Sequence, residues 1–270
     1  MTILIAIDME GISGVVLTSH IMKDEREYQR YRRLMTAETN AAVEGALAGG
    51  ADRVIVNDGH GGMTNLIIEE LNPAAEYICG TLKPHGMIQG IGPDIDAVFL
   101  VGYHAMSGAG AAVLEHTWFL RVVEVRLNGT IVGEGGISAA MAGAYGVPVV
   151  LVTGDRAVTE EMKTLLGDVE TVVVKEGISR YSARCLHPQV ARKRIREAAE
   201  RAARTRGTPL VLDAPVTVSV TFLRASHADM AELLPGSRRV DGRTVEWTGE
   251  DMPTVYRAFK AMLSLSADDE

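Results

Sequence analysis

Cysteine is almost absent from this chain of 270 residues. Only Cys79 and Cys185 occur, and neither has another cysteine near it in the sequence. Their spacing excludes a disulfide framework and a CxxC redox or metal motif. Any metal site in this protein must therefore be built from imidazole and carboxylate ligands instead of thiolates.

The sequence also lacks a surplus of basic charge and a long apolar run. It has 27 lysine and arginine residues against 35 aspartate and glutamate residues, which gives a formal net charge of −8. An acidic surface argues against a nucleic-acid partner or an anionic membrane. No apolar segment reaches the roughly 18 to 20 residues that a membrane span needs. The N-terminal residues do not have the pattern of a signal peptide. We therefore expect a cytoplasmic protein.

Short apolar runs rich in Val and Ile alternate with helical patterns along most of the chain. Continuous runs of this kind predict strands that are buried on both faces, as in a parallel sheet. The predicted strands cover residues 3–7, 53–57, 96–102, 147–153 and 170–175. The predicted helices cover residues 24–48, 134–145, 156–166 and 188–206. The alternation predicts an α/β catalytic domain over residues 1–207, with a mostly parallel sheet and flanking helices.

Two segments depart from this alternation. Residues 121–134 alternate apolar and polar side chains around Asn128-Gly129, which predicts a β-hairpin insertion with a two-residue type I′ turn. Residues 208–270 predict a smaller α+β domain with a strand, a second hairpin and a final amphipathic helix over about 250–265. With 47% hydrophobic residues, the chain has ample material for one large and one small core.

Polar side chains follow three of the predicted strands at the point where each strand ends. The first strand runs into Asp8 and Glu10, the second into Asp58 and His60, and the third into His104. The carboxyl ends of parallel strands meet at one edge of a sheet, where α/β proteins bind their ligands. We therefore expect these side chains to lie together at one rim.

Mixed carboxylate and imidazole ligands suit a divalent metal, with zinc the leading candidate. Asp8, at the strand end itself, is the natural bridge between two ions about 3.5–4 Å apart. Glu134, just after the hairpin, adds a further carboxylate. The alternative is that Asp8 and Glu10 only cap the turn that follows the strand.

The segments IDMEGISG, VNDGHGGMTNL, GYHA, EHTWF and GEGGISA together resemble the zinc-dependent D-aminopeptidases of the bacterial dipeptide-transport operon type. These motifs lie between residue 7 and about residue 145, and a looser likeness continues into GDRAV and VKEGISRYSARCL. The resemblance implies that two zinc ions per subunit are bound by Asp8, Glu10, His60, His104 and Glu134.

The same resemblance assigns His116 as the catalytic residue. It also implies a homo-oligomer, a ring-shaped decamer of two pentamers, that releases N-terminal D-amino acids from short peptides. His116 has the chemistry to act near pH 7 as a general acid or base, or as a nucleophile. A structural histidine at a strand start is the alternative. The loop 107–116 is rich in Gly and Ala, so we carry over no side-chain preference for the substrate.

Two other classes of function fit the same ligand set. A two-metal hydrolase of another class, a phosphoesterase or an amidase, would use a similar site. No Arg or Lys lies within the rim motifs to hold a phosphate, and Lys83 is the nearest candidate by sequence. A binding protein with a structural metal is the third reading. Five ligands shared over two ions leave open positions, which favours catalysis.

Overall fold

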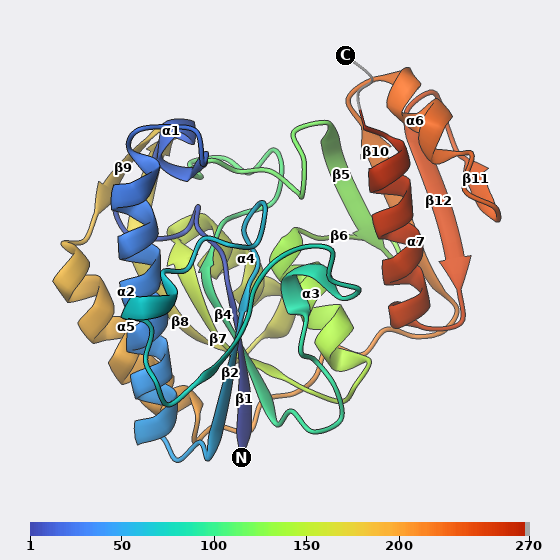
Figure 1. Ribbon diagram of the computed structural model, residues 1–270. Coiled ribbons are helices and arrows are strands. Elements are labelled where there is room, and N and C mark those ends of the chain that lie inside the picture. The colour runs from blue at the N-terminus through green and yellow to red at the C-terminus, as the bar shows by residue number, and fades with distance from the viewer. Residues whose placement is uncertain (268–270) are drawn as a thin grey trace.

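A seven-stranded sheet forms the centre of the protein, and Figure 1 shows helices on both of its faces. The computed structural model describes residues 1–267. The strand order is β3-β2-β1-β4-β7-β8-β9, and all neighbouring strands are parallel except β8 and β9. The strands are β1 (Thr2–Ile7), β2 (Arg53–Asp58), β3 (Glu76–Ile78), β4 (Ala97–Tyr103), β7 (Val149–Asp155), β8 (Glu170–Ser179) and β9 (Ser182–Cys185). The predicted α/β fold with a mostly parallel sheet is confirmed.

Both faces of this sheet are buried, as the continuous apolar runs predicted. In β1, Ile3, Ile5 and Ile7 point into one core, and Leu4 and Ala6 point into the other. The first core lies under α2 (Tyr28–Ala48) and α5 (Pro188–Ala202). The second core lies under α3 (Glu134–Gly143) and α4 (Arg156–Leu166) and continues into the C-terminal elements. Residues 3–7 of β1 are therefore packed on both faces, which explains why no polar residue lies between Thr2 and Asp8.

The second sheet joins the predicted hairpin to the C-terminal part of the chain. Its order is β11-β12-β10-β5-β6, all antiparallel. The strands are β5 (Val122–Leu127), β6 (Thr130–Ile131), β10 (Val216–Phe222), β11 (Ser237–Arg239) and β12 (Thr244–Gly249), with helices α6 (Ala225–Ala231) and α7 (Met252–Leu265) beside them. Asn128 and Gly129 both have positive φ, 46° and 84°, as a type I′ turn requires.

The antiparallel sheet takes strands from both of the predicted domains, because β5 pairs with β10 across the register Val218 to Leu127. The boundary between residues 207 and 208 stays a prediction. Residues 268–270 of the smaller predicted domain lie outside the described part of the chain. None of the helices within residues 1–267 is long and apolar enough to cross a membrane.

The first long helix begins later than the sequence predicted. A short helix α1 (Thr18–Ile21) is followed by turns, and α2 starts at Tyr28 instead of after Asp24. The Tyr28 side chain is buried and donates a hydrogen bond from its hydroxyl to Asn65 Oδ1 at 2.7 Å. A tertiary contact therefore fixes this helix start, whereas the prediction from Asp24 used only a local capping rule.

Candidate metal centre

The ends of β1 and β4 approach each other closely at the rim of the main sheet. A Cβ atom on Gly11 would lie 1.9 Å from the carbonyl oxygen of Tyr103, and one on Gly102 would lie 2.3 Å from that of Asp8. Gly102 also has a φ of +69°. Only glycine fits at both positions. The backbone contact places the Asp8 and Glu10 side chains beside His104.

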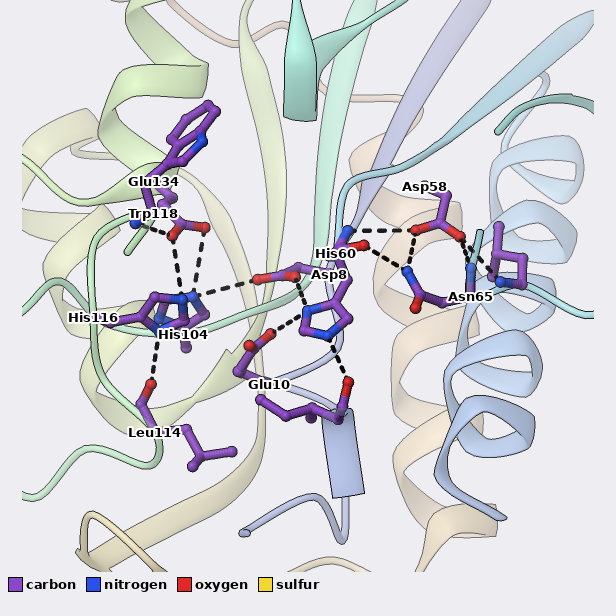
Figure 2. Close-up of polar contacts among 12 residues, drawn as sticks. Asp8, Glu10, Asp58, His60, Asn65, His104, Leu114, His116, Trp118 and Glu134 are labelled. Carbon is purple, nitrogen blue, oxygen red and sulfur yellow. Dashed lines mark hydrogen bonds and ion pairs between the residues drawn. The ribbon is translucent and has the colours of Figure 1, made fainter. Parts of the chain in front are cut away.

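The structure brings together all five residues that the sequence proposed as ligands (Figure 2). His60 Nδ1 lies 3.3 Å from Asp8 Oδ1 and 3.0 Å from Glu10 Oε2. His104 Nε2 lies 3.4 Å from Asp8 Oδ2 and 3.5 Å from Glu134 Oε2. Asp8 therefore directs one oxygen to each histidine, so that two groups of potential ligands share this one carboxylate.

His60 and His104 each hold one ring nitrogen against a backbone carbonyl oxygen and turn the other toward the acids. His60 Nε2 donates to the carbonyl oxygen of Ile21 at 3.1 Å, and His104 Nδ1 donates to that of Ala105 at 3.0 Å. A carbonyl oxygen only accepts, so it fixes the proton on the nitrogen that faces it. The opposite nitrogen is then free to bind an ion, and this outer carbonyl contact is common among metal-bound histidines.

Three polar atoms of the cluster are buried with no hydrogen-bond partner among the described residues. They are Asp8 Oδ2, Glu10 Oε2 and His104 Nε2. Buried polar atoms of this kind are costly unless something satisfies them. Carboxylate oxygens and imidazole nitrogens that converge on common points satisfy each other best through a shared cation. The donor set, with no sulfur, fits zinc.

Burial and the neighbouring charges together raise the pKa values of three members of the cluster. Burial and the neighbouring Glu10 raise the pKa of Asp8 to about 7. Burial alone would lower the pKa of His60 and of His104, but the carboxylates beside them hold both pKa values well above the ordinary range. Without an ion, protons held between the carboxylates and the imidazoles balance the negative charge of the buried acids. Metal binding at such a site is expected to release protons.

His116 lies inside this cluster, although it is separate from the strand-end motifs in sequence. Its ring stacks on that of His104, with centroids 4.1 Å apart and planes at 9°. Its Nε2 lies 3.7 Å from Glu134 Oε1, and its Nδ1 donates to the carbonyl oxygen of Leu114 at 2.9 Å. Burial and the His104 charge lower the pKa of His116. Glu10, His104 and His116 also form a third possible ligand group, so the assignment of His116 as catalytic and not a ligand stays a prediction.

Asp58, which we expected at the rim with a metal-capable side chain, does not join the cluster. Its carboxylate accepts from the backbone nitrogens of Asn65 at 2.6 Å and Leu66 at 3.0 Å, and from Asn65 Nδ2 at 2.8 Å. Figure 2 shows it turned toward Asn65, and its Oδ1 also accepts from the backbone nitrogen of His60 at 3.3 Å. Asp58 instead organises the loop that carries His60. The sequence alone does not distinguish an acid that caps a loop from one that binds a metal.

Sequence reasoning missed several residues that support the site. The backbone nitrogen of Trp118 donates to Glu134 Oε1 at 2.6 Å, and the EHTWF motif was the only sign of it. Lys83, considered above as a phosphate ligand, is buried, and its ammonium group donates to Asn57 Oδ1 at 2.7 Å and to the carbonyl oxygen of Asp58 at 2.6 Å. Lys83 therefore holds the β2 end in place and is not available to a substrate.

A pocket of about 550 Å³ opens beside the cluster. Asp8, Glu10, His60, His116 and Glu134 all line it. Its outer part carries apolar and aromatic side chains, including Met22, Leu114, Trp118, Phe119, Leu120 and Tyr181. The buried acids and imidazoles therefore lie at the floor of a pocket that reaches the surface. This arrangement is typical of an active site and not of a closed structural metal site.

The chain is similar to known proteins along almost its whole length. Residues 1–261 match the D-aminopeptidase family. The chain belongs to this family. It is 34% identical over 270 residues to a D-aminopeptidase of Bacillus subtilis (strain 168), and the alignment covers 98% of each protein. Its fold is similar, with a TM-score of 0.96 and 33% identity over 98% of each chain, to the solved structure of a protein described as the Zn-dependent D-aminopeptidase DppA from Bacillus subtilis, a self-compartmentalizing protease.

The family assignment confirms the resemblance that the motifs indicated. It also confirms that this chain is an enzyme, a hydrolase of the aminopeptidase class. The match extends beyond residue 207, so the C-terminal elements belong to the family fold as well as the α/β part.

Proposed function

We propose that this D-aminopeptidase family member is a dinuclear zinc enzyme that releases N-terminal D-amino acids from short peptides. The observation that carries the proposal is the position of Asp8, whose two oxygens face two different groups of buried donors. A carboxylate in that position is suited to bridge two ions. The Bacillus subtilis relative of known structure is described as Zn-dependent, which supports zinc as the metal.

The groups of potential ligands support one division of the residues between the two ions. Glu10 and His60 would hold one ion, His104 and Glu134 would hold the other, and Asp8 would bind both. Two bound zinc ions supply a water of lowered pKa and a Lewis acid for the scissile carbonyl. The other groups of the site then have to move protons and orient the peptide.

The position of His116 supports it as the group that moves those protons. Its Nδ1 proton is held by the carbonyl oxygen of Leu114, so Nε2 faces the pocket as the proton acceptor. Its lowered pKa keeps the ring neutral near pH 7, which is the form that a general base needs. In our proposal His116 takes a proton from the attacking water and gives it to the leaving amine. Direct attack by Nε2 on the carbonyl is the alternative, and trapping of an acyl-enzyme would identify it.

The shape of the pocket supports a small substrate with a free amine. About 550 Å³ is enough for a short peptide, and the outer apolar side chains offer contact area for its side chains. A free N-terminal amine gives the substrate an anchor that decides which bond lies over the reactive water. An internal bond of a long chain has no such anchor.

The deciding experiment compares kcat/KM for D-Ala-D-Ala, L-Ala-L-Ala and N-acetylated D-Ala-D-Ala on zinc-loaded protein, with a generic phosphoester in a fourth assay. We expect the D-peptide with a free amine to be cleaved fastest. Faster cleavage of the L-peptide would contradict the stereochemical part of the proposal alone. Equal cleavage of the acetylated peptide would contradict aminopeptidase action, and turnover of the phosphoester alone would favour the phosphoesterase alternative.

We also propose that the protein is a homo-oligomer. The Bacillus subtilis relative is described as self-compartmentalizing, which is an assembly that encloses its own active sites. A decamer is the form that the family resemblance implies. The expectation of a cytoplasmic protein stays a prediction, and fractionation of the source cells would check it.

A further inference from the structure

The Glu10 side chain is aimed at the metal position without a hydrogen bond that would fix its direction there. Its Oε2 atom is buried without a hydrogen-bond partner among the described residues, and His60 Nδ1 lies 3.0 Å from it. In the metal-bound form, with which this inference is concerned, Nε2 donates to Ile21 and His60 Nδ1 would bind the ion, so it has no proton to give to Glu10. The direction of the Glu10 carboxylate must therefore be set through the backbone of the turn that carries it.

A lysine from a distant strand holds that turn. Lys175, in β8, is 1% exposed, and its ammonium group donates to the carbonyl oxygens of Glu10, Ile12 (3.1 Å) and Val15 (2.6 Å). An ammonium group has three protons, so one side chain uses its full donor capacity on a single turn. Charged hydrogen bonds of this kind are stronger than bonds between neutral groups.

Two more contacts tie the same turn to other elements. The Ser13 backbone nitrogen donates to Glu38 Oε1 at 3.0 Å, and the Ser13 hydroxyl donates to the carbonyl oxygen of Leu186 at 2.6 Å. Glu38 is a buried residue of α2. Residues 10–15 are therefore held from β8, from α2 and from the segment after β9, with Lys175 making the contact at Glu10 itself.

We infer that Lys175 is a positioning residue of the metal centre, whose ammonium group fixes the turn at residues 10–15 and thereby directs the Glu10 carboxylate toward its ion. The inference rests on the zinc site of the proposed function. The competing view is that Lys175 only stabilises the fold.

The two effects of removing the Lys175 ammonium group change the zinc affinity in opposite directions, which allows a test of this inference. Lys175 is a positive charge close to an acidic metal site, and like charges repel. Its removal, taken by itself, would strengthen the binding of a cation. Positioning has the opposite effect, because a displaced Glu10 carboxylate weakens binding. Loss of zinc affinity in a variant without the ammonium group therefore reports the geometry of the turn.

The experiment uses the full-length protein and two variants, Lys175→Met and Val172→Ala. Methionine has a similar length and shape but no charge or donor. Val172 is a buried residue of the same strand, so its truncation lowers stability without touching the Glu10 turn. Zinc dissociation constants are measured by competition with a chromogenic chelator, zinc per subunit by elemental analysis, and folding by urea titration.

We expect Lys175→Met to bind zinc about 10- to 100-fold more weakly than the wild type, as for other residues that orient metal ligands. Val172→Ala is expected to bind zinc as the wild type does. Equal or tighter zinc binding by folded Lys175→Met would overturn the inference. So would an equal loss of zinc affinity in Val172→Ala, because stability alone would then explain it.

If Lys175→Met does not fold, the variant Lys175→Gln is used in the same experiment. Lys175→Gln retains a hydrogen-bond donor for the turn but has no charge. It is expected to bind zinc about 10- to 100-fold more weakly than the wild type. Equal or tighter zinc binding by the folded variant would overturn the inference. If the wild type itself binds no zinc, the proposed function fails, and this result is distinct from a failure at Lys175.

Discussion

Asp8 is the residue on which the two halves of the site depend. It follows the last residue of β1, where the strand leaves the core, and it is almost completely buried. Its short side chain holds the carboxylate close to the backbone, so that Oδ1 and Oδ2 reach different histidines. A longer side chain would carry the carboxylate past both of them. An amide would keep the shape but lose the charge that a bridging ligand needs.

The first prediction concerns this bridge. Asp8→Ala is expected to lose both zinc ions, because each ligand group loses its shared oxygen. Glu134→Ala, which removes a ligand from one group only, is expected to retain about one ion per subunit. Elemental analysis of the purified variants measures both values. Two ions retained in Asp8→Ala would show that this residue does not bridge.

The second prediction concerns His116. His116→Ala is expected to keep its zinc but to lose activity by about a hundredfold or more, because the proton acceptor at the pocket is gone. Zinc content and kcat are measured on the same preparation. Loss of zinc would make His116 a ligand, as its distance to Glu134 permits. Normal kcat with normal zinc would return it to a structural role.

The elements of the structure matter to the site chiefly through their ends. Polar residues after β1, β2 and β4 meet because parallel neighbours end at the same rim. Helix α3 begins at Glu134, so its first residue is also a proposed ligand. The two chain segments approach closely at this rim, since the β4 backbone at Gly102 contacts the backbone of Asp8, directly after β1.

The third prediction tests this close approach. Gly102→Ala places a Cβ 2.3 Å from the carbonyl oxygen of Asp8, whereas Gly108→Ala, at a similar positive φ of +82°, meets no atom within 4 Å. Both variants bear the cost of a left-handed backbone, about 1 kcal/mol or more. Gly102→Ala is expected to be less stable than Gly108→Ala in urea and to bind zinc more weakly. Equal stability and zinc affinity in the two variants would contradict it.

The fourth prediction concerns pH and the helix residue Glu38. Burial raises its pKa from 4.5 to about 7, with a smaller opposing effect of the Ser13 hydrogen bond. The folded state therefore prefers protonated Glu38. Its ionisation costs stability increasingly as the pH rises from about 4.5 through 7. Glu38→Gln removes this cost and keeps an oxygen for Ser13.

The stability difference between Glu38→Gln and the wild type is expected to shift in favour of the variant by about 1 to 2 kcal/mol between pH 5.5 and pH 7.5. Urea titrations at the two pH values, with saturating zinc, measure it. A difference that is constant with pH would show that Glu38 titrates normally. A shift in favour of the wild type would show that Glu38 is stabilised as a carboxylate.

At the scale of the whole molecule, the C-terminal elements support the site. The hairpin β5–β6 leads directly to Glu134 and is held by pairing between β5 and β10. Trp118, whose backbone donates to Glu134, packs edge-on against Tyr256 and Phe259 of α7, with ring centroids 6.0 and 5.3 Å away. The second sheet and α7 therefore fix the Glu134 side of the pocket. Figure 1 shows α7 beside the strands of this sheet.

The fifth prediction is made at this scale. The protein is expected to sediment as an assembly much heavier than one 29.0 kDa chain, with a decamer near 290 kDa, which is ten times 29.0 kDa. The C-terminal elements pack on the core of the same chain, so the expectation of an assembly rests on the family resemblance. Sedimentation velocity on zinc-loaded protein measures the mass, and a stable monomer would contradict the prediction.

The sequence alone determined the α/β fold, the type I′ turn at Asn128-Gly129 and the residues that gather at the rim. These features follow from local rules, because the hydrophobic periodicity and the turn residues of a short segment predict its structure. The topological rule then placed Asp8, His60 and His104 at one edge. Only the family resemblance assigned a role to His116.

Tertiary structure decided the rest. Contacts between distant segments set the start of α2 at Tyr28 and direct the Asp58 carboxylate to the backbone of Asn65. They also stack the ring of His116 on that of His104. Tertiary structure also brought Lys175 to the carbonyl of Glu10, a residue 165 positions away. A buried lysine and a solvated one look alike in a sequence. Which carbonyl a side chain reaches depends on how separate strands pack, and no local pattern records that distance.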